Sequence, residues 1–486
     1  MITTVVGKTF LEAYNQKYQT QKTPKEFFEE VYFELFYNHS KYMQWVNNSP
    51  MVQGITSSDN NIYGREIGKA KLKNTEEVVR IKSQLAIQFG ENRVLEKTDK
   101  SKDKIVFLEI NDEIQRRERL AKFHEKVDTE DPDGSFVLGY PASASEEFAS
   151  TSGLVSDLDI PTTVDDAYLS WIGSGLGIGV AGGFTILFDD PAITLQTFEG
   201  WKVYRKYLKD DGLDKLRGNQ INTWNGQWLK YSLDEDLFRE DFDFAELTNK
   251  KIFEVSSTLV EVNTVNWSEL FFSLSQLYPK GELTGYVYGL GQTNKTIGFI
   301  PFYFKSGTRI IEVYKQLFGS TNTDKKKFEA LFGMHIKRAC ELGSIGLQAL
   351  RPEKLKDFMS SDKTISFKKE EDTINYFAYK TWLVAMLSKN KEEITDYTLD
   401  IAETILRYRN GSKGTERPNL INKELFASKT KRGFIDALTV MVKDLDTNDL
   451  ERIKKLKDEI HLMTNEEFGY FCTLLKFDYA FLEKKS

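Results

Sequence analysis

The chain has 486 residues, of which 40% are hydrophobic and 13% aromatic, and it contains only 10 prolines. Its length allows about three domains with separate cores, and its composition excludes a largely disordered chain. The 2 cysteines and 4 scattered histidines form no ligand pattern, so we expect no metal centre and no cofactor. Residues 1–10 lack the apolar run of a secretory signal, which makes a reducing cytoplasm the expected compartment.

The net charge of −7 is distributed unevenly along the chain. Residues 1–324 sum to −11, whereas residues 325–486 sum to +4. The strongest basic segment, from Arg407 to Arg432, holds 8 Lys and Arg residues but only 2 acidic ones. A solvated surface is one interpretation of such a run, and contact with a phosphate backbone is the leading functional one.

The N-terminal part of the chain predicts an α/β region. Apolar residues at helical spacing indicate a long amphipathic helix over residues 24–47. A strand is predicted at residues 105–110, and a charged helix at residues 112–127. Residues 128–166 contain Pro, Gly and Ser clusters and predict a loop or linker, so the first predicted domain is residues 1–127.

Residues 169–188 carry no charge but are rich in glycine. Because glycines weaken a helix and only aspartates flank the segment, we expect no membrane span. The spacing of Gly177, Gly179 and Gly182 matches a dinucleotide-binding fingerprint, but a strand follows where that motif needs a helix. We interpret the segment as a strand pair or loop whose backbone lies close to a partner.

The segment from Gly218 to Trp228 combines several side-chain amides with two tryptophans and two glycines. Amides can pair with base edges and indoles can stack on bases, which makes this a candidate recognition loop. A polar loop with core tryptophans is the alternative. A second glycine and amide loop at residues 289–295 joins the predicted strands 284–288 and 296–304, and an ordinary hairpin turn is its alternative.

The chain from residue 325 to the end predicts a helical bundle. Capping patterns at Thr464 with Glu467, and at Asn390 with Glu393, support two of the starts. The predicted helices cover residues 325–349, 368–388, 390–409, 430–445, 448–461 and 464–483. The expected fold class is therefore α+β, in which a mixed α/β N-terminal and central region, the latter at 167–324, precedes the bundle at 325–486.

The sequence contains no phosphate-binding loop, zinc-protease, hydrolase or calcium-loop motif. Two carboxylate pairs, Asp157 with Asp159 and Asp189 with Asp190, leave a Mg²⁺ site as a minor alternative. His39 lies in an aromatic helix, where a structural imidazole is favoured over a catalytic base. We therefore expect a protein that is not an enzyme, although a site assembled from distant residues would leave no local motif.

Four short sequence segments resemble those of a known protein family. These segments are Asn48-Ser49-Pro50, Glu199–Arg205, Gly218–Trp228 and Lys429–Leu438. Together with the order of an α/β front, glycine-rich strands, a hairpin and a basic helical tail, they make the chain resemble the large subunit of type I CRISPR surveillance complexes, known as Cascade. Some branches of that family carry cysteine pairs that this chain lacks, so the branch stays open.

The resemblance implies a noncatalytic subunit of an RNA-guided assembly. Such a subunit recognises the short motif beside a DNA target, stabilises the opened duplex and recruits a helicase-nuclease. The implied partners are a guide RNA with repeated backbone subunits, the double-stranded DNA target and its displaced single strand. Because the tail resembles the small subunit, a separately translated C-terminal product starting at Met334 or Met359 is also implied.

Two sets of residues are the predicted contacts under this hypothesis. Contact with the duplex or the adjacent motif is assigned to Asn219, Gln220, Asn222, Trp224, Asn225, Gln227, Gln292, Asn294 and Lys295. Contact with the backbone of the displaced strand is assigned to Arg407, Arg409, Lys413, Lys429, Lys431 and Arg432. The alternative function is a structural or protein-interaction component of a phage or defence assembly.

Overall fold

The computed structural model describes most of the chain, and its α+β architecture agrees with the predicted fold class. The described residues are 1–58, 61–130, 134–138, 161–234, 238–289, 295–319, 331–334, 336–360, 363, 365, 367–388 and 397–485. The chain divides into two compact units. Unit 1 comprises Met1–Asn266 and Leu283–Ile300, and unit 2 comprises Trp267–Glu282 and Pro301–Ser486.

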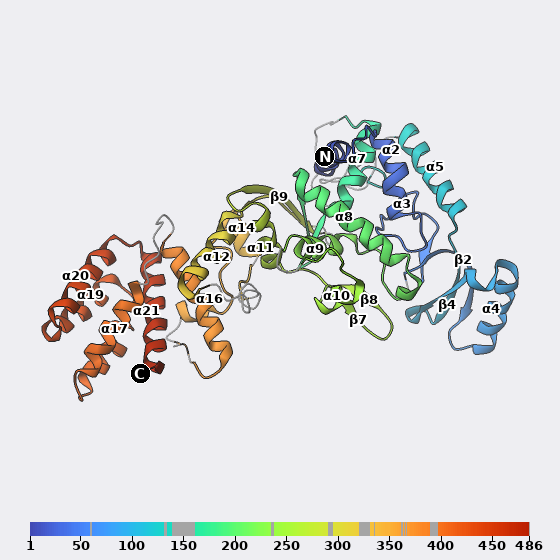
Figure 1. The fold of residues 1–486 in the computed structure, drawn as a ribbon. Coiled ribbons are helices and arrows are strands. Elements are labelled where there is room, and N and C mark those ends of the chain that lie inside the picture. The colour runs from blue at the N-terminus through green and yellow to red at the C-terminus, as the bar shows by residue number, and fades with distance from the viewer. Residues whose placement is uncertain are drawn as a thin grey trace. The chain divides into compact units, whose positions relative to one another are not determined.

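Unit 1 combines helices with short antiparallel sheets (Figure 1). Its helices are α1 (Ile2–Tyr18), α2 (Pro24–Phe27), η1 (Phe28–Tyr32), α3 (Phe33–Phe36), α4 (Thr75–Phe89), η2 (Glu91–Arg93), η3 (Lys100–Lys102), α5 (Glu113–Thr129), α7 (Val164–Gly175), α8 (Pro191–Leu208), η4 (Asp211–Leu213), α9 (Ile221–Ser232) and α10 (Phe244–Asn249). The first sheet has the order β1-β2-β4-β3, with β1 (Thr56–Ser57), β2 (Tyr63–Lys71), β3 (Val94–Asp99) and β4 (Lys104–Ile110).

The other strands form two further sheets. The glycine-rich segment contributes β5 (Ile178–Val180) and β6 (Phe184–Phe188) to a sheet of order β10-β9-β6-β5, with β9 (Glu282–Gly289) and β10 (Lys295–Tyr303). A third sheet pairs β7 (Phe253–Val255) with β8 (Val260–Val262). The predicted strands 284–288 and 296–304 therefore form neighbouring strands, as expected.

The predicted boundary between residues 1–127 and 167–324 does not separate two units, because one aromatic core joins these segments. Phe10, Trp171 and Trp201 are fully buried together in this core. Helices α1 and α7 pack at close range because Gly7 and Gly173 face each other at their contact. The N-terminal and glycine-rich segments are therefore one folding unit.

The helix predicted at residues 24–47 is shorter than expected. A capping box at Thr23 starts it, and its helical conformation ends at Phe36. The guanidinium of Arg205 donates hydrogen bonds to the carbonyls of Leu35 at 2.5 Å and Phe36 at 3.4 Å, which are among the last of the helix. A cation at a helix C-terminus satisfies carbonyls that have no helical partner, so Arg205 stabilises this end.

Unit 2 is mainly helical (Figure 1), in agreement with the predicted C-terminal bundle. Its helices are α11 (Trp267–Leu277), α12 (Lys305–Phe318), α14 (Ile336–Leu342), α15 (Leu355–Ser360), α16 (Glu370–Leu387), α17 (Tyr397–Asn410), α18 (Glu416–Asn419), η5 (Leu420–Leu425), α19 (Lys431–Met441), η6 (Val442–Asp444), α20 (Thr447–Leu462) and α21 (Asn465–Lys485). The predicted capping pair is present, because Thr464 Oγ1 accepts from the Glu467 N–H at 3.2 Å. The unit begins earlier than residue 325, and the proposed cap at Asn390 and Glu393 lies outside the described residues.

Candidate nucleic-acid interface

From Ile221 onward, the amide and tryptophan segment forms a helix, α9, and not an open loop. The indole of Trp224 is fully buried, stacks on Tyr204 with 5.2 Å between ring centroids, and donates to the Gly200 carbonyl at 2.7 Å. The Trp228 indole donates to the Gln196 carbonyl at 2.8 Å. Both tryptophans therefore attach α9 to α8, and the assignment of Trp224 to duplex contact was wrong.

Two of the amides are also inside the protein. Asn225 is 0% exposed, and its Nδ2 donates to the carbonyls of Gly175 and Gly177, both at 2.8 Å. Gln227 is 3% exposed. A base edge cannot reach either side chain in this fold, so these two assignments were wrong as well. The amide of Asn225 instead satisfies backbone carbonyls that the glycine-rich segment leaves without a ladder partner.

The glycine backbone does approach a partner closely, but the partner is α9 of the same chain. A Cβ built on Gly226 would lie 2.4 Å from the Gly179 carbonyl oxygen. A Cβ on Gly179 would in turn lie 2.9 Å from the backbone of Asn222. The glycines therefore allow a helix to pack directly on β5, which explains their number without a ligand.

Three of the other predicted duplex contacts precede or begin α9 and are at least partly accessible. Asn219 is exposed and has a left-handed φ of 53°, while Gln220 and Asn222 are half-buried. The Gln220 Oε1 accepts from the Val262 N–H at 3.1 Å. Lys295 begins β10, and Gln292 and Asn294 lie outside the described residues.

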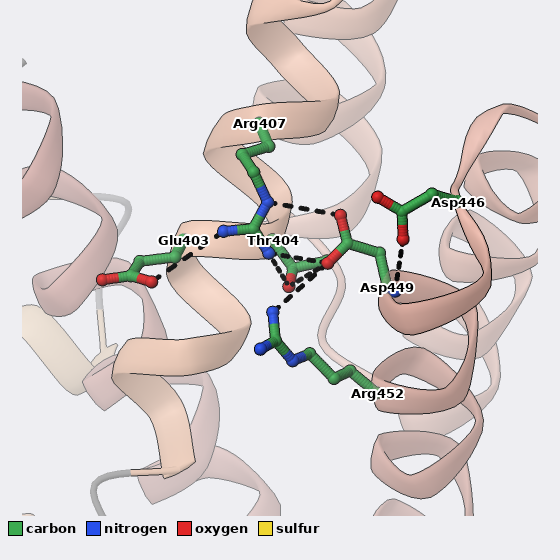
Figure 2. Close-up of polar contacts among 6 residues, drawn as sticks. All are labelled: Glu403, Thr404, Arg407, Asp446, Asp449 and Arg452. Atoms are coloured by element: carbon green, nitrogen blue, oxygen red, sulfur yellow. Dashed lines mark hydrogen bonds and ion pairs between the residues drawn. The ribbon is translucent and has the colours of Figure 1, made fainter.

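Arg407 in the basic segment is engaged in a polar cluster inside unit 2 (Figure 2). Its Nη2 lies 2.6 Å from Asp449 Oδ1, and its Nε lies 3.3 Å from Asp449 Oδ2. Thr404 donates to the same carboxylate at 3.2 Å, and Arg452 Nη1 lies 3.3 Å from it. The hydrogen bond from Arg407 is the main reason that the pKa of Asp449 lies below its ordinary value. Arg407 therefore joins α17 to α20, and its guanidinium is already paired.

Two further predicted contacts have structural partners. Arg409 donates to the Tyr479 hydroxyl at 3.1 Å and forms an ion pair with Glu483. The Lys431 ammonium donates to the Met463 carbonyl. These side chains hold the helices of unit 2 together, so they are weaker candidates for strand contact than the sequence indicated.

Three of the six predicted strand contacts remain available. The side chain of Arg432 is 93% exposed, and its nearest acid is Asp436 at 3.9 Å. Lys413 and Lys429 are exposed, and in the described part of the chain no carboxylate lies within 4.0 Å of either ammonium. Lys413 follows α17, whereas Lys429 and Arg432 flank the start of α19. We call Lys413, Lys429 and Arg432 the exposed cation set.

The carboxylates considered for Mg²⁺ have structural roles where they are described. Asp190 caps α8 by accepting from the Ile193 N–H at 2.9 Å, and Asp189 accepts from the Thr9 hydroxyl at 2.5 Å. Asp157 and Asp159 lie outside the described residues. Among the residues that the structure describes, no group of three or more His, Cys, Asp or Glu side chains is placed to hold a metal ion.

His39 is a structural imidazole, as the sequence indicated. Its Nδ1 accepts from the Lys41 N–H at 3.0 Å. Burial lowers the pKa of His39 from 6.5 to about 3, and the nearby cation Arg205 adds to this effect. Because the ring stays neutral, it can keep accepting this bond at neutral pH.

The depressed pKa of His39 predicts a pH-dependent stability. Between pH 6.5 and about 3 the unfolded chain binds a proton that the folded chain lacks, so stability falls as pH decreases through this window. Unfolding by urea at pH 7 and pH 5 should show a larger loss for the unsubstituted chain than for His39→Asn, by about 2 kcal/mol. Equal losses in both chains would contradict this role.

Sequence reasoning missed one group of exposed cations in unit 1. Lys69 and Lys71 alternate with Gly68 and Ala70 along β2, a period of two that places both lysines on one face of the sheet. This alternation along β2 is the sequence pattern from which the two exposed lysines could have been predicted.

No protein-family model, curated protein or solved structure matches the chain. In the part of the chain that the structure describes, none of the helices has the length and apolar character needed to cross a bilayer.

Proposed function

We propose that the chain is the noncatalytic large subunit of an RNA-guided DNA surveillance complex of type I. The type of assembly is inferred from the resemblance to Cascade large subunits. The observation that carries the proposal is the exposed cation set. These side chains are accessible within a segment whose other arginines are paired. Exposed Lys and Arg that neutralise phosphates are the usual source of affinity for nucleic acid.

The proposed contacts are narrower than those expected from sequence. Strand contact is assigned to the exposed cation set of Lys413, Lys429 and Arg432. Duplex contact retains only Asn219, Gln220 and Asn222 from the α9 segment, together with Gln292, Asn294 and Lys295. Recognition of the motif beside the target, binding of a guide RNA and recruitment of a helicase-nuclease remain parts of the proposal.

Neutralising the exposed cation set should weaken binding and its dependence on salt. In the triple variant Lys413→Gln/Lys429→Gln/Arg432→Gln, the slope of log K against log salt for single-stranded DNA should fall by about 2, because each lost phosphate contact removes about 0.7. Fluorescence anisotropy with a labelled strand across a salt series measures this slope.

A matched variant separates local contact from net charge. Lys305, Lys315 and Lys354 are exposed cations elsewhere in unit 2, and their triple replacement by glutamine changes the net charge equally. We expect this control to retain the slope of the unsubstituted chain. Equal decreases in both triple variants would reject the assignment of strand contact to the exposed cation set.

A protein-interaction component is the second candidate function, and an apolar groove favours it. The groove, with a volume of about 270 Å³, lies between α19 and α20 and is lined by Leu438, Val442, Leu450 and Ile453 among others. Exposed apolar surface of this kind is common where proteins bind one another. Association with DNA that is weak and insensitive to salt, even within a complete assembly, would favour this candidate.

A further inference from the structure

The first sheet of unit 1 has one face covered by a helix. A Cβ built on Gly68 would lie 3.0 Å from Leu85 of α4 and 3.7 Å from Phe107 of β4. Ala70 and Ile105 belong to the same small apolar cluster. The cross-strand partners of Gly68 and Ala70 on β3 and β4 share their face of the sheet, so their side chains also point toward α4. Figure 1 shows α4 beside these strands.

The opposite face carries four lysines. Cross-strand partners share a face, so Lys69 of β2 and Lys97 of β3 both lie beside Val106 of β4 on the side away from α4. Two residues further on, Lys71 lies directly opposite Lys104 on that same side. We call Lys69, Lys71, Lys97 and Lys104 the lysine face.

The direct pairing of Lys71 with Lys104 is unfavourable for the isolated protein. Like charges directly opposite on one sheet face destabilise it. In the described part of the chain, no carboxylate lies within 4.0 Å of either ammonium. On its other side, Lys104 lies opposite Asp99 of β3, whose Oδ1 accepts from the Ser101 hydroxyl and the Lys102 N–H, which commits this oxygen to the local turn.

The other two lysines have partners that leave them accessible. Lys69 is 53% exposed and pairs with Glu66 at 2.6 Å. The Lys97 ammonium donates to the Thr56 hydroxyl at 3.0 Å, which uses one of its three protons. Asp99 opposite Lys104 offsets part of the charge of that lysine. Four lysines against the two acids Glu66 and Asp99 still give this face a local excess of positive charge.

We propose that the lysine face binds the phosphate backbone of a single-stranded nucleic acid. Charge complementarity selects this occupant, because a row of phosphates would neutralise lysines that the protein leaves opposed. The described strands place no aromatic side chain among these lysines for base stacking, and no amide for base-edge pairing. Binding should therefore be independent of base sequence and equal for RNA and DNA strands.

This inference rests on the proposed nucleic-acid-binding function and adds a second contact, in unit 1. The test is the full chain with Lys71→Gln/Lys104→Gln, titrated with a fluorescein-labelled single-stranded RNA and with a DNA strand of the same sequence. The slope of log K against log salt should fall by about 1.4 for both probes, since two phosphate contacts are lost. The thermal midpoint should stay the same or rise, because a like-charge pair has been removed.

A matched control lies on the covered side of the sheet. Arg80→Gln/Lys82→Gln removes the same charge from exposed positions of α4 and should leave the slope unchanged. An equal decrease in this control would overturn the proposal in favour of a general charge effect. A loss of thermal stability in the Lys71/Lys104 variant, with an unchanged slope, would also overturn it.

The exposed cation set separates failure of this inference from failure of the proposed function. If the Lys413/Lys429/Arg432 variant lowers the slope and the Lys71/Lys104 variant does not, the lysine face is not a contact and the proposed function stands. If the unsubstituted chain binds neither strand in a salt-dependent manner, the proposed function fails, and the lysine face fails with it.

Discussion

Replacing Asp478 by alanine is expected to destabilise unit 2 by about 3–5 kcal/mol, because it leaves a buried ammonium without its counter-charge. The Lys380 Nζ lies 3.0 Å from Asp478 Oδ1, and these side chains are 2% and 0% exposed. The hydroxyls of Tyr376 and Thr398 donate to the same carboxylate at 2.8 and 2.7 Å. Hydrogen-exchange mass spectrometry on peptides from α16 and α21 should show a marked loss of protection.

A double variant distinguishes a lost ion pair from a lost side chain. Lys380→Met/Asp478→Leu replaces both charges with apolar groups of similar size and should recover most of the stability, since a buried pair contributes little net free energy over such a replacement. If the double variant were as unstable as Asp478→Ala, the unpaired charge would not be the cause of the defect.

The second large effect is expected where α1 crosses α7. A Cβ on Gly173 would lie 1.9 Å from the Thr3 carbonyl oxygen, and a Cβ on Gly7 would lie 2.1 Å from that of Leu169. Both obstacles are helix backbone, which cannot move aside as a flexible side chain can. Gly173→Ala should therefore destabilise unit 1 by about 3 kcal/mol, at the upper end of the usual cost of overpacking. Urea unfolding monitored by tryptophan fluorescence measures this change.

Gly469 of α21 is the control for this substitution. A Cβ built there meets no other atom within 4 Å. Gly469→Ala should be neutral or stabilise the helix by up to about 1 kcal/mol, because alanine has the higher helix propensity. Loss of stability in both glycine variants would show that the cost is not specific to the α1 and α7 crossing.

The sequence predicted correctly those helices and strands that are determined by residues close together in the chain. The strand at 105–110 is a short apolar run whose residues 105–109 are all buried, and the start at Thr464 depends on a residue three positions away. The helix from Asp112 onward begins with a side-chain cap that the sequence shows directly. In each case the residues that decide the structure lie within one turn or one strand.

The recognition site was predicted less well because its residues have distant partners. The Asn225 amide bonds to the Gly175 and Gly177 carbonyls, about 50 positions earlier in the chain. Arg407 and Arg409 are paired with Asp449 and Glu483, which lie beyond the segment that looked basic. Composition within a window cannot show such pairing, so buried amides looked like base readers and paired arginines looked available.

The lysine face is a charged surface that the local sequence did not indicate. Its lysines are separated by as many as 35 positions, from Lys69 to Lys104, and no stretch of β2, β3 or β4 is strongly basic alone. Antiparallel pairing gathers them on one side of the sheet. The sequence shows the alternation of Lys69 and Lys71 on β2, but the grouping of all four lysines becomes visible only when the strand register is known.

The proposed function places the chain in an RNA-guided assembly. Affinity purification of the tagged full-length chain from cells that encode it, followed by native mass spectrometry and RNA sequencing, tests this most directly. We expect small RNAs with a common repeat-derived end, together with several copies of one backbone subunit. Recovery of the chain alone, or in an assembly without RNA, from cells expressing the system would contradict the proposed function.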